Sequence, residues 1–431
     1  MFVISFQSLL NIFLNMFSDC FKQRKDSQFF HIFNDYRLNI KILFSSLIII
    51  MLITWSIFYV IIPNKTSTTT TNNYNGIDPF NTNNPLEKKI HIVILFDGDR
   101  GLQYLNSLLK SIFYYQNGRF RCDLKACCLS NFCDPFMNDC QTVMNNVSTT
   151  YTTVFHFLIT TISSNSQLLN LMNTWKIRNM EYHFYSCGDY LADFWWIQSK
   201  HSSGAKPFLK LMIATILPPT INKVIVLDID ILLNTDIIEL WNHFDYFEET
   251  QSIGIGLEQN PYFQKVMTKL DSNWKGYGYN NGVLLLHLSK IRSTNWNQLW
   301  MNKTKRALAK QGYLTTGEQD ILNLILFEFK YMLYEIPCEW NIQLSDGSDE
   351  QRCPVSWLTY AELKKRNYAT IVKQPKLIHI NHHIKPDDVK AKYIPTEYID
   401  QSDVILKQWE LYDKFVSVYR QYTKLHESCF Q

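Results

Sequence analysis

Two pairs of aspartates, each pair separated by one residue, follow apolar runs in this 431-residue chain. Asp228 and Asp230 come directly after KVIVL, and Asp97 and Asp99 come after IHIVILF. Carboxylates one residue apart on an extended strand point to opposite sides, so both can meet one ligand only where the chain turns. Oxygen ligands of this kind suit Mg²⁺ or Mn²⁺ held together with phosphate oxygens. Solvation in loops, or capping of a following helix, is the alternative role for each pair.

The elements that must position these carboxylates can be predicted from the alternation of apolar and amphipathic stretches. Short, fully apolar runs indicate buried strands, and the stretches between them have helical periodicity. Thr235 or Asp236 can cap the helix that follows the second aspartate pair. This order predicts an α/β fold with a mostly parallel sheet covered on both faces and ligands bound beyond the carboxyl ends of its strands. The predicted strands are 90–96, 155–159, 180–186, 223–227, 253–258, 282–288 and 376–380, and the predicted helices are 102–115, 166–175, 207–217, 235–244 and 318–329.

A membrane anchor is predicted near the N-terminus. Residues 42–62 form a run of 21 residues without a charge, and an apolar helix of about 20 residues spans a bilayer core. A buried core helix is the alternative. Basic residues are concentrated before this run, which predicts a cytoplasmic tail over 1–41 and type II topology. The Asn- and Thr-rich residues 63–88 are typical of a flexible stalk, which leaves 89–431 as the folded luminal domain.

Composition and cysteine usage limit the class of partner and the compartment. A net charge of +3 argues against a nucleic-acid binder, and 46% hydrophobic residues fit a globular core. Nine of the ten cysteines follow the predicted anchor, five of them within 122–140, and disulfides are expected in an oxidising lumen. A zinc site is the alternative, but the CxxC pairs or Cys/His spacing that it would need are absent. Because nine is odd, one thiol is free or joins two chains in a disulfide-linked dimer.

Longer motifs surround the candidate residues and extend along most of the chain after residue 90. In order they are HIVIL, LLKSIF, IQSKHSSGAKPFLKLMI, VIVLDIDILLNTDIIELW, YNNGVLLL, EQDILN, CEWNIQLSD and LIHINHHIKP. This series resembles glycosyltransferase family 8, and within it the xylosyltransferase domain of the LARGE proteins. The resemblance runs with gaps from about residue 90 to 390. One departure is the pair Glu318-Gln319, where the family usually has Asp-Gln.

The resemblance implies a GT-A type fold, a nucleotide-sugar donor and Mn²⁺. It implies that Asp228, Asp230 and His379 bind the metal, although His382 and His383 are close in sequence to the third ligand. Asp97 and Asp99 are expected to contact the nucleoside. Asn280 and Gly282 are expected in a loop on the sugar side, and Gln319 in the acceptor pocket. The implied donor contacts are Asp97, Lys210, Asp228, Asn280, Gly282 and Lys385, and the implied sugar- or acceptor-positioning residues are Glu318, Gln319 and Asp320.

These observations together predict a Golgi type II membrane protein with a retaining, Mn²⁺-dependent glycosyltransferase domain. Xylose from UDP-xylose is the expected donor sugar, and a glycan on a glycoprotein is the expected acceptor. A UDP-glucose or UDP-galactose transferase of the same family and an inactive, membrane-tethered glycan-binding protein are the alternatives. Cys338 and Cys353 are expected to pair with each other, because a similarly spaced pair occurs in the LARGE-like pattern.

Overall fold

The computed structural model describes residues 88–116, 151–177, 179–356, 358, 360–388 and 405–430. The predicted membrane span at 42–62, the predicted stalk up to residue 87 and the cysteine-rich 122–140 stretch lie outside these residues. Within the described ranges, no helix has both the length and the apolar character needed to cross a membrane.

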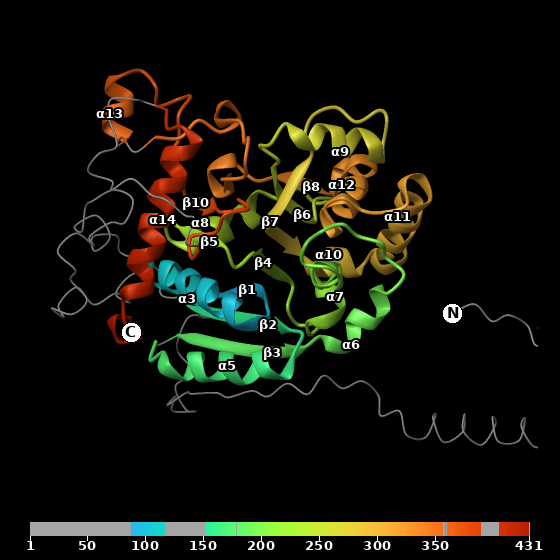
Figure 1. The fold of residues 1–431 in the computed structure, drawn as a ribbon, viewed down its shortest axis with the longest axis horizontal. Coiled ribbons are helices and arrows are strands. Elements are labelled where there is room, and N and C mark those ends of the chain that lie inside the picture. Colours follow the sequence, from blue (N-terminus) through green and yellow to red (C-terminus); the bar gives the residue numbers. More distant parts are fainter. Residues whose placement is uncertain are drawn as a thin grey trace, which may run out of the picture. The chain divides into compact units, whose positions relative to one another are not determined.

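A seven-stranded mixed sheet with the order β3-β2-β1-β4-β7-β6-β8 forms the centre of the fold (Figure 1). Four neighbouring pairs in it are parallel, and only β7 runs antiparallel to both of its neighbours. The mostly parallel sheet predicted from the sequence is therefore confirmed. The strands are β1 (Lys88–Phe96), β2 (Tyr151–Ile159), β3 (Met180–Ser186), β4 (Lys223–Leu227), β6 (Ile253–Leu257), β7 (Tyr279–His287) and β8 (Leu333–Glu335).

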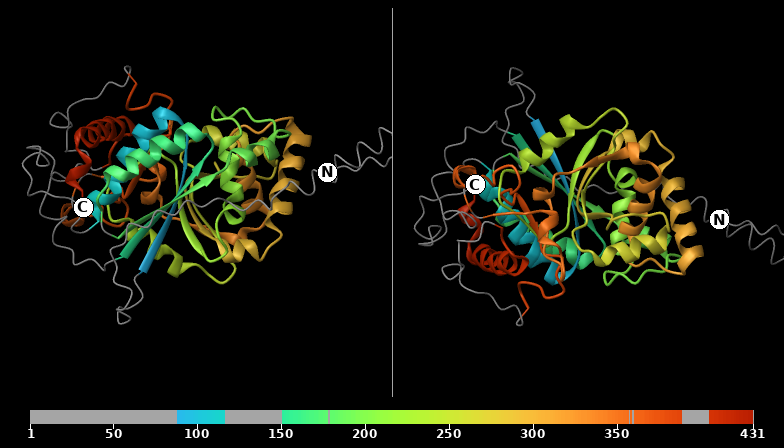
Figure 2. Two further views of the ribbon diagram at one scale, coloured as in Figure 1. Left: turned by 90° about the horizontal axis from the view of Figure 1, so that it is seen from below. Right: turned by 90° about the horizontal axis from the view of Figure 1, so that it is seen from above.

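Helices cover both faces of this sheet, as Figure 2 shows. Successive residues of a strand point to opposite faces, and in β1 Ile92 and Ile94 join one hydrophobic cluster while Val93 joins the other. The first cluster includes α3 (Gly98–Tyr115), α5 (Ile162–Thr174) and α14 (Gln408–Lys424). The second includes α7 (Ile213–Ile216), α9 (Tyr262–Leu270), α10 (Leu288–Arg292), α11 (Trp296–Gln311) and α12 (Glu318–Glu328).

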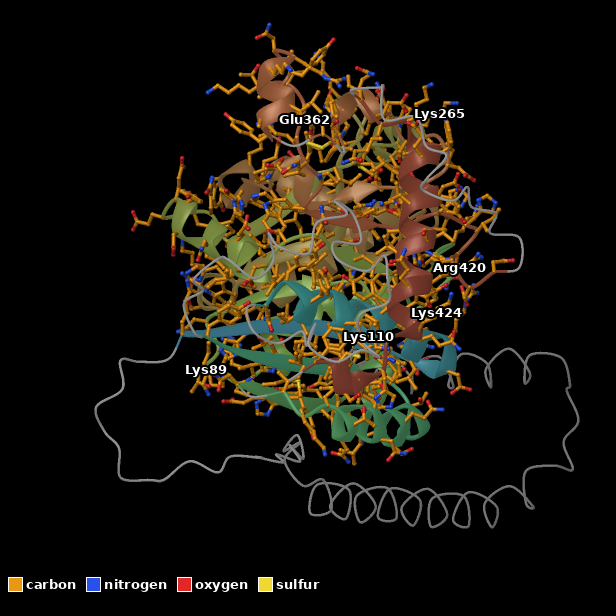
Figure 3. The ribbon with its side chains drawn as sticks, turned by 90° about the vertical axis from the view of Figure 1, so that its left-hand side faces the viewer. Lys89, Lys110, Lys265, Glu362, Arg420 and Lys424 are labelled. Carbon is orange, nitrogen blue, oxygen red and sulfur yellow. A yellow bond between two sulfur atoms is a disulfide. The ribbon has the colours of Figure 1, made fainter. Side chains whose placement is uncertain are left out.

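The C-terminal helix α14, absent from the sequence prediction, packs against α3. A buried cation fixes this contact: Lys110 Nζ donates to the Leu425 carbonyl at 2.5 Å and lies 3.3 Å from Glu427 Oε1. Burial lowers the pKa of Lys110, although Glu427 acts in the opposite direction. Figure 3 shows Lys110 near the end of α14 that carries Lys424. The segment after residue 405 is therefore part of the core of this domain.

A second, three-stranded sheet has the order β5-β10-β9 and was not foreseen. It consists of β5 (Ile231–Leu233), β10 (Leu377–His379) and β9 (Ile342–Gln343). The sequence predicted a strand at 376–380 but not its partners, because two- and three-residue strands are too short to show a two-residue period. This small sheet begins one residue after Asp230, and His379 is the last residue of β10.

Two predicted helices are shorter than expected. The 207–217 stretch forms a 3₁₀ helix, η2 (Lys206–Met212), followed by the single turn of α7. Pro207 lies in its first turn, and Pro218 follows Leu217, whose backbone is extended, as expected before a proline. The 235–244 helix is α8 (Ile237–Trp241) followed by a 3₁₀ turn. Asp236, not Thr235, caps α8 by accepting from the Ile238 amide at 3.0 Å.

The described cysteines agree with an oxidising compartment. Cys338 and Cys353 form a disulfide with an S–S distance of 2.00 Å, so the predicted pairing is confirmed. Cys429 is also disulfide-bonded. Cys187 is a free thiol that is fully buried, and burial raises its pKa to about 12. A buried thiol cannot reach a second chain, so Cys187 does not support the predicted disulfide-linked dimer.

Two histidines on neighbouring strands of the main sheet, His91 of β1 and His156 of β2, lead to a prediction about pH. His156 is fully buried, 3.0 Å from both His91 and the Tyr185 hydroxyl. Burial lowers the pKa of His91 to about 4 and that of His156 well below 6.5. The folded state therefore holds both rings neutral, whereas the unfolded chain protonates them below pH ~6.5. The stability that the neutral rings allow is fully present above pH ~6.5 and is lost as the pH falls towards 4.

We expect His156→Gln to reduce the pH dependence of unfolding. Each proton taken up only on unfolding changes the free energy of unfolding by about 1.4 kcal/mol per pH unit. Urea unfolding of the wild type and the variant between pH 7 and pH 5 measures the two slopes. Equal slopes would show that His156 takes up its proton without unfolding.

Candidate active site

The second aspartate pair lies in a bend between β4 and β5, where the chain leaves the main sheet. The Asp228 amide donates to the Gly282 carbonyl of β7 at 2.9 Å, and the Asp230 carbonyl accepts from the Ile380 amide at 2.9 Å. The bend is thus tied to the main sheet on one side and to the chain after β10 on the other. It allows both carboxylates to converge, as the sequence argument required.

His379 completes a group of three potential metal ligands with these aspartates. One ligand atom from each residue lies within 4.8 Å of the other two. His379 Nε2 is 3.4 Å from Asp230 Oδ1 and 3.8 Å from Asp228 Oδ2. Its Nδ1 lies 3.3 Å from Asn341 Oδ1, which can accept only from a protonated Nδ1. In the neutral tautomer that donates from Nδ1 to this oxygen, Nε2 presents its lone pair to the carboxylates, as a metal ligand requires.

Gly282 makes room for the His379 ring. A Cβ atom at this position would lie 2.3 Å from His379 Cε1 and 2.4 Å from Nδ1, far inside van der Waals contact. The prediction that Asn280 and Gly282 lie in a loop is wrong, because both are residues of β7. This strand pairs with β6 on both sides of a bulge, as far as Tyr279. Asn280 is buried and turned toward the protein, donating to Glu258 and accepting from the Gly282 amide.

Two lysines form ion pairs with the aspartates. Lys210 Nζ, from the 3₁₀ helix η2, lies 2.7 Å from Asp228 Oδ1, and Lys385 Nζ donates to Asp230 Oδ2 at 2.6 Å. Burial acts to raise the pKa of Asp230, but Lys385 and His379 outweigh it and hold this pKa well below its usual range. Burial acts to lower the pKa of Lys210, but Asp228 and Glu318 outweigh it and raise this pKa. The site therefore holds fixed charges of both signs.

The first residues of α12 border this charged group. Asn281 of β7 donates from its side chain to Glu318 Oε1 at 2.8 Å and from its backbone to Gln319 Oε1 at 3.2 Å. Lys210 Nζ lies 3.5 Å from the same Glu318 oxygen. The other oxygen, Oε2, is buried and has no hydrogen-bond partner in the part of the chain that the structure describes. Glu318 and Gln319 are thus brought to the predicted site.

Asp320 is not brought to the site. Its carboxylate accepts from the Thr315 amide at 2.6 Å and from the amide and hydroxyl of Thr316. Burial raises its pKa, although the bonds from Thr316 act in the opposite direction. These contacts give Asp320 a role in shaping the turn before α12, which corrects its predicted role in positioning the sugar. A carboxylate in the first helical turn often serves in this way.

The first aspartate pair lies at the carboxyl end of β1 and makes different contacts. Asp97 forms an ion pair with Lys206 and accepts from the Thr161 hydroxyl at 3.1 Å. Burial acts to raise its pKa, but Lys206 and the hydroxyl outweigh burial and lower it. Asp99 accepts from Gln167. Neither side chain belongs to the group formed by the second pair.

Two polar residues of the site were missed by the sequence analysis. Asn341 contacts the His379 ring and donates to Asn280 Oδ1 at 3.0 Å. Glu258 is fully buried, accepts from Asn280 at 3.0 Å, and has a pKa raised by burial. Asn341 lies within the motif CEWNIQLSD, but nothing in the sequence distinguished it as a site residue. A buried carboxylate after β6 looks, in sequence, like any residue at a strand end.

Comparisons with known proteins place these residues in a family. Residues 127–387 match the sequence profile of glycosyl transferase family 8, a range that includes every site residue from Lys210 to Lys385. The Mus musculus protein named xylosyl- and glucuronyltransferase LARGE2 is 35% identical over 209 residues, which are 48% of this chain and 30% of that protein. The Homo sapiens protein named xylosyl- and glucuronyltransferase LARGE1 is 34% identical over 201 residues, which are 46% of this chain and 26% of that protein.

Solved structures are similar at lower identity. The apo form of mouse xyloside xylosyltransferase 1 has a TM-score of 0.48 and 18% identity, with 68% of this chain and 98% of that chain covered. The galactosyltransferase LgtC, in complex with donor and acceptor sugar analogues, has a TM-score of 0.46 and 16% identity, with 70% and 90% covered. The two curated relatives are matched over no more than 30% of their own length.

Proposed function

The chain belongs to glycosyltransferase family 8, and from this membership we propose that residues 89–431 form a GT-A type, metal-dependent, retaining glycosyltransferase that uses a UDP-sugar. The observation that carries the proposal is the convergence of Asp228, Asp230 and His379 beside two lysines. The carboxylates lie in the bend that leads from the main sheet into β5, and β10, which pairs with β5, brings the imidazole from a segment about 150 residues further along the chain.

The residues present suit a divalent ion. Two carboxylates with one imidazole form a donor set that Mn²⁺ accepts well. The missing side chain of Gly282 leaves space for the imidazole, and Asn341 orients it. When bound by Asp228, Asp230 and His379, such an ion would supply positive charge against the diphosphate of the donor.

The other side chains can bind and orient the reactants. Lys210 and Lys385 place two ammonium groups beside the aspartates, where they can stabilise the negative charge that develops on a leaving diphosphate. Glu318 Oε2, which is buried and has no hydrogen-bond partner among the described residues, is suited to accept a hydrogen bond from a sugar hydroxyl. Gln319, held by Asn281, borders the same space and is assigned to the acceptor side. No protein nucleophile is assigned in this retaining transfer.

The donor, the acceptor and the compartment complete the proposal. The names of the LARGE relatives support xylose from UDP-xylose as the donor sugar, and UDP-glucose and UDP-galactose are the competing donors. The acceptor is a glycan on a glycoprotein. Residues 42–62 would anchor the protein in the Golgi membrane, with the tail 1–41 in the cytoplasm and the stalk 63–88 leading to the luminal domain.

We expect Mn²⁺-dependent release of UDP when the full chain, purified in detergent, is given UDP-xylose. Parallel reactions with UDP-glucose, UDP-galactose and UDP-glucuronic acid identify the donor, and EDTA should stop the reaction until Mn²⁺ is restored. Release that persists in EDTA would contradict metal dependence. A protein that binds UDP-sugars or glycans without turnover of any donor would favour the inactive glycan-binding alternative.

A further inference from the structure

A second group of potential metal ligands is formed by Asp346, in the loop after β9, and by His382 and His383, in the segment after β10. Asp346 lies between two adjacent histidines, with one carboxylate oxygen against His382 Nε2 and the other 2.5 Å from His383 Nδ1. One ligand atom from each of the three residues lies within 4.8 Å of the other two. The two imidazole rings are stacked, with their centroids 4.6 Å apart. No residue is shared with the Asp228–Asp230–His379 group.

Two members of this group, His382 and Asp346, are held in place by residues outside it. The His382 ring packs against Tyr412 of α14 at 4.8 Å between centroids. Its Nδ1 lies 3.2 Å from the Ile384 carbonyl and 3.0 Å from the Ile384 amide, so the backbone can serve either tautomer. The Asp346 carbonyl accepts from Asn260 at 2.7 Å. A histidine that ligates through Nε2 needs such a backbone acceptor for its Nδ1 proton.

The chemistry of this group differs from that of the first. Two imidazole nitrogens and one carboxylate oxygen form a donor set typical of zinc sites, in which solvent takes a further position. The first group has two carboxylates and one imidazole, and it lies between two ammonium groups. Asp346 and His383 are more than half exposed, so an ion can reach the second group directly from solvent.

We propose that Asp346, His382 and His383 form a second metal site, which binds a divalent transition-metal ion of the zinc type. The ion replaces the contacts that the carboxylate now makes with the two rings. It joins the loop after β9, which carries Asp346, to the segment after β10, which carries both histidines.

This tether would act on the segment that carries Lys385. That segment is also held from another direction, because Asp387 accepts from Arg100 Nε at 2.9 Å and from a second guanidinium nitrogen at 3.0 Å. Between these two attachments, Lys385 donates to Asp230 and to the Ile380 carbonyl. On the side of His382 the segment is held by the packing of that ring against Tyr412 and by the Tyr412 hydroxyl, which donates to the Ile384 carbonyl at 3.3 Å, and metal binding at the second site would restrict it further.

Zinc titration of the full chain, purified without metal under non-reducing conditions and followed by calorimetry, tests the proposal. The background variant Asp230→Asn impairs the first group, and we expect it to retain binding of one Zn²⁺ at this site. His383→Gln and Asp346→Asn, introduced separately into that background, should each weaken this binding by at least about tenfold. His383 is exposed, so its replacement is not expected to affect folding.

The matched control is His426→Gln, an exposed histidine outside the group, which should leave the binding unchanged. Co²⁺ used in place of Zn²⁺ should give visible absorption bands that His383→Gln diminishes. The proposal is overturned if His383→Gln and Asp346→Asn bind Zn²⁺ like their background, since the group would then be a hydrogen-bonded cluster only. Zn²⁺ binding that disappears in Asp230→Asn alone would assign the ion to the first group and would equally overturn it.

Discussion

Asp230→Asn should lower kcat by about two orders of magnitude or more while the fold survives. The asparagine has nearly the same shape as the aspartate but removes the negative charge that faces both His379 and Lys385. If the carboxylate helps to hold an ion against the diphosphate, its loss acts on charge that develops in the transition state. Such a change lowers kcat more than it raises KM. Steady-state kinetics over a range of UDP-sugar and Mn²⁺ concentrations measure both effects.

Asp97→Ala is the matched comparison, since it removes an aspartate from the rival pair at the end of β1. Asp97 contacts Lys206 and Thr161 but none of the three proposed ligands. A nucleoside contact contributes similar binding before and during reaction, so this variant should chiefly raise KM for the UDP-sugar. Circular dichroism confirms that both variants are folded. If Asp97 controlled the Mn²⁺ dependence and Asp230 were dispensable, the site would have been assigned to the wrong strand.

Gly282→Ala should abolish most of the Mn²⁺-dependent activity although it replaces none of the three proposed metal ligands. The added methyl group would lie 2.3 Å from the His379 ring, which is buried and therefore cannot move aside without disturbing its neighbours. We expect the ring to leave the two carboxylates, with a loss of metal affinity and a loss of stability of about 1–3 kcal/mol from overpacking. Mn²⁺ binding, followed by electron paramagnetic resonance, is measured together with the melting temperature.

Substitutions at two other glycines distinguish the loss of metal affinity from the loss of stability. Gly256→Ala adds a methyl group that meets Asn341 Cβ at 3.5 Å, an ordinary contact, and should preserve both activity and stability. Gly254→Ala would bring a methyl group to 2.8 Å from Leu285 Cβ and should lower stability while Mn²⁺ affinity is kept in the folded protein. A Gly282→Ala protein that binds Mn²⁺ like the wild type would show that His379 is not a ligand.

Local sequence patterns were sufficient for the parts of this protein that depend on neighbours in the chain. Apolar runs predicted the strands that carry Asp97 and Asp228 at their carboxyl ends, because burial on both faces of a sheet demands continuous apolar residues. The resemblance to a family then distinguished the two aspartate pairs and suggested His379 and the Cys338–Cys353 bond. Helix lengths were less accurate, since prolines and 3₁₀ turns shortened two of the helices.

The convergence of the site was decided only by the tertiary structure. Strands as short as β5 and β9 have no detectable period, yet their pairing with β10 brings His379 beside Asp230. The same packing directs the Asp320 carboxylate into the turn before α12 and places Gly282 of the main sheet against the His379 ring of the small sheet. It also brings Asp346 to His382 and His383, two histidines whose positions in the sequence showed only that they are close to His379. Sequence determined which side chains were available. Contacts between residues far apart in the chain determined which of them meet, because such contacts depend on the whole packed core and leave no local pattern.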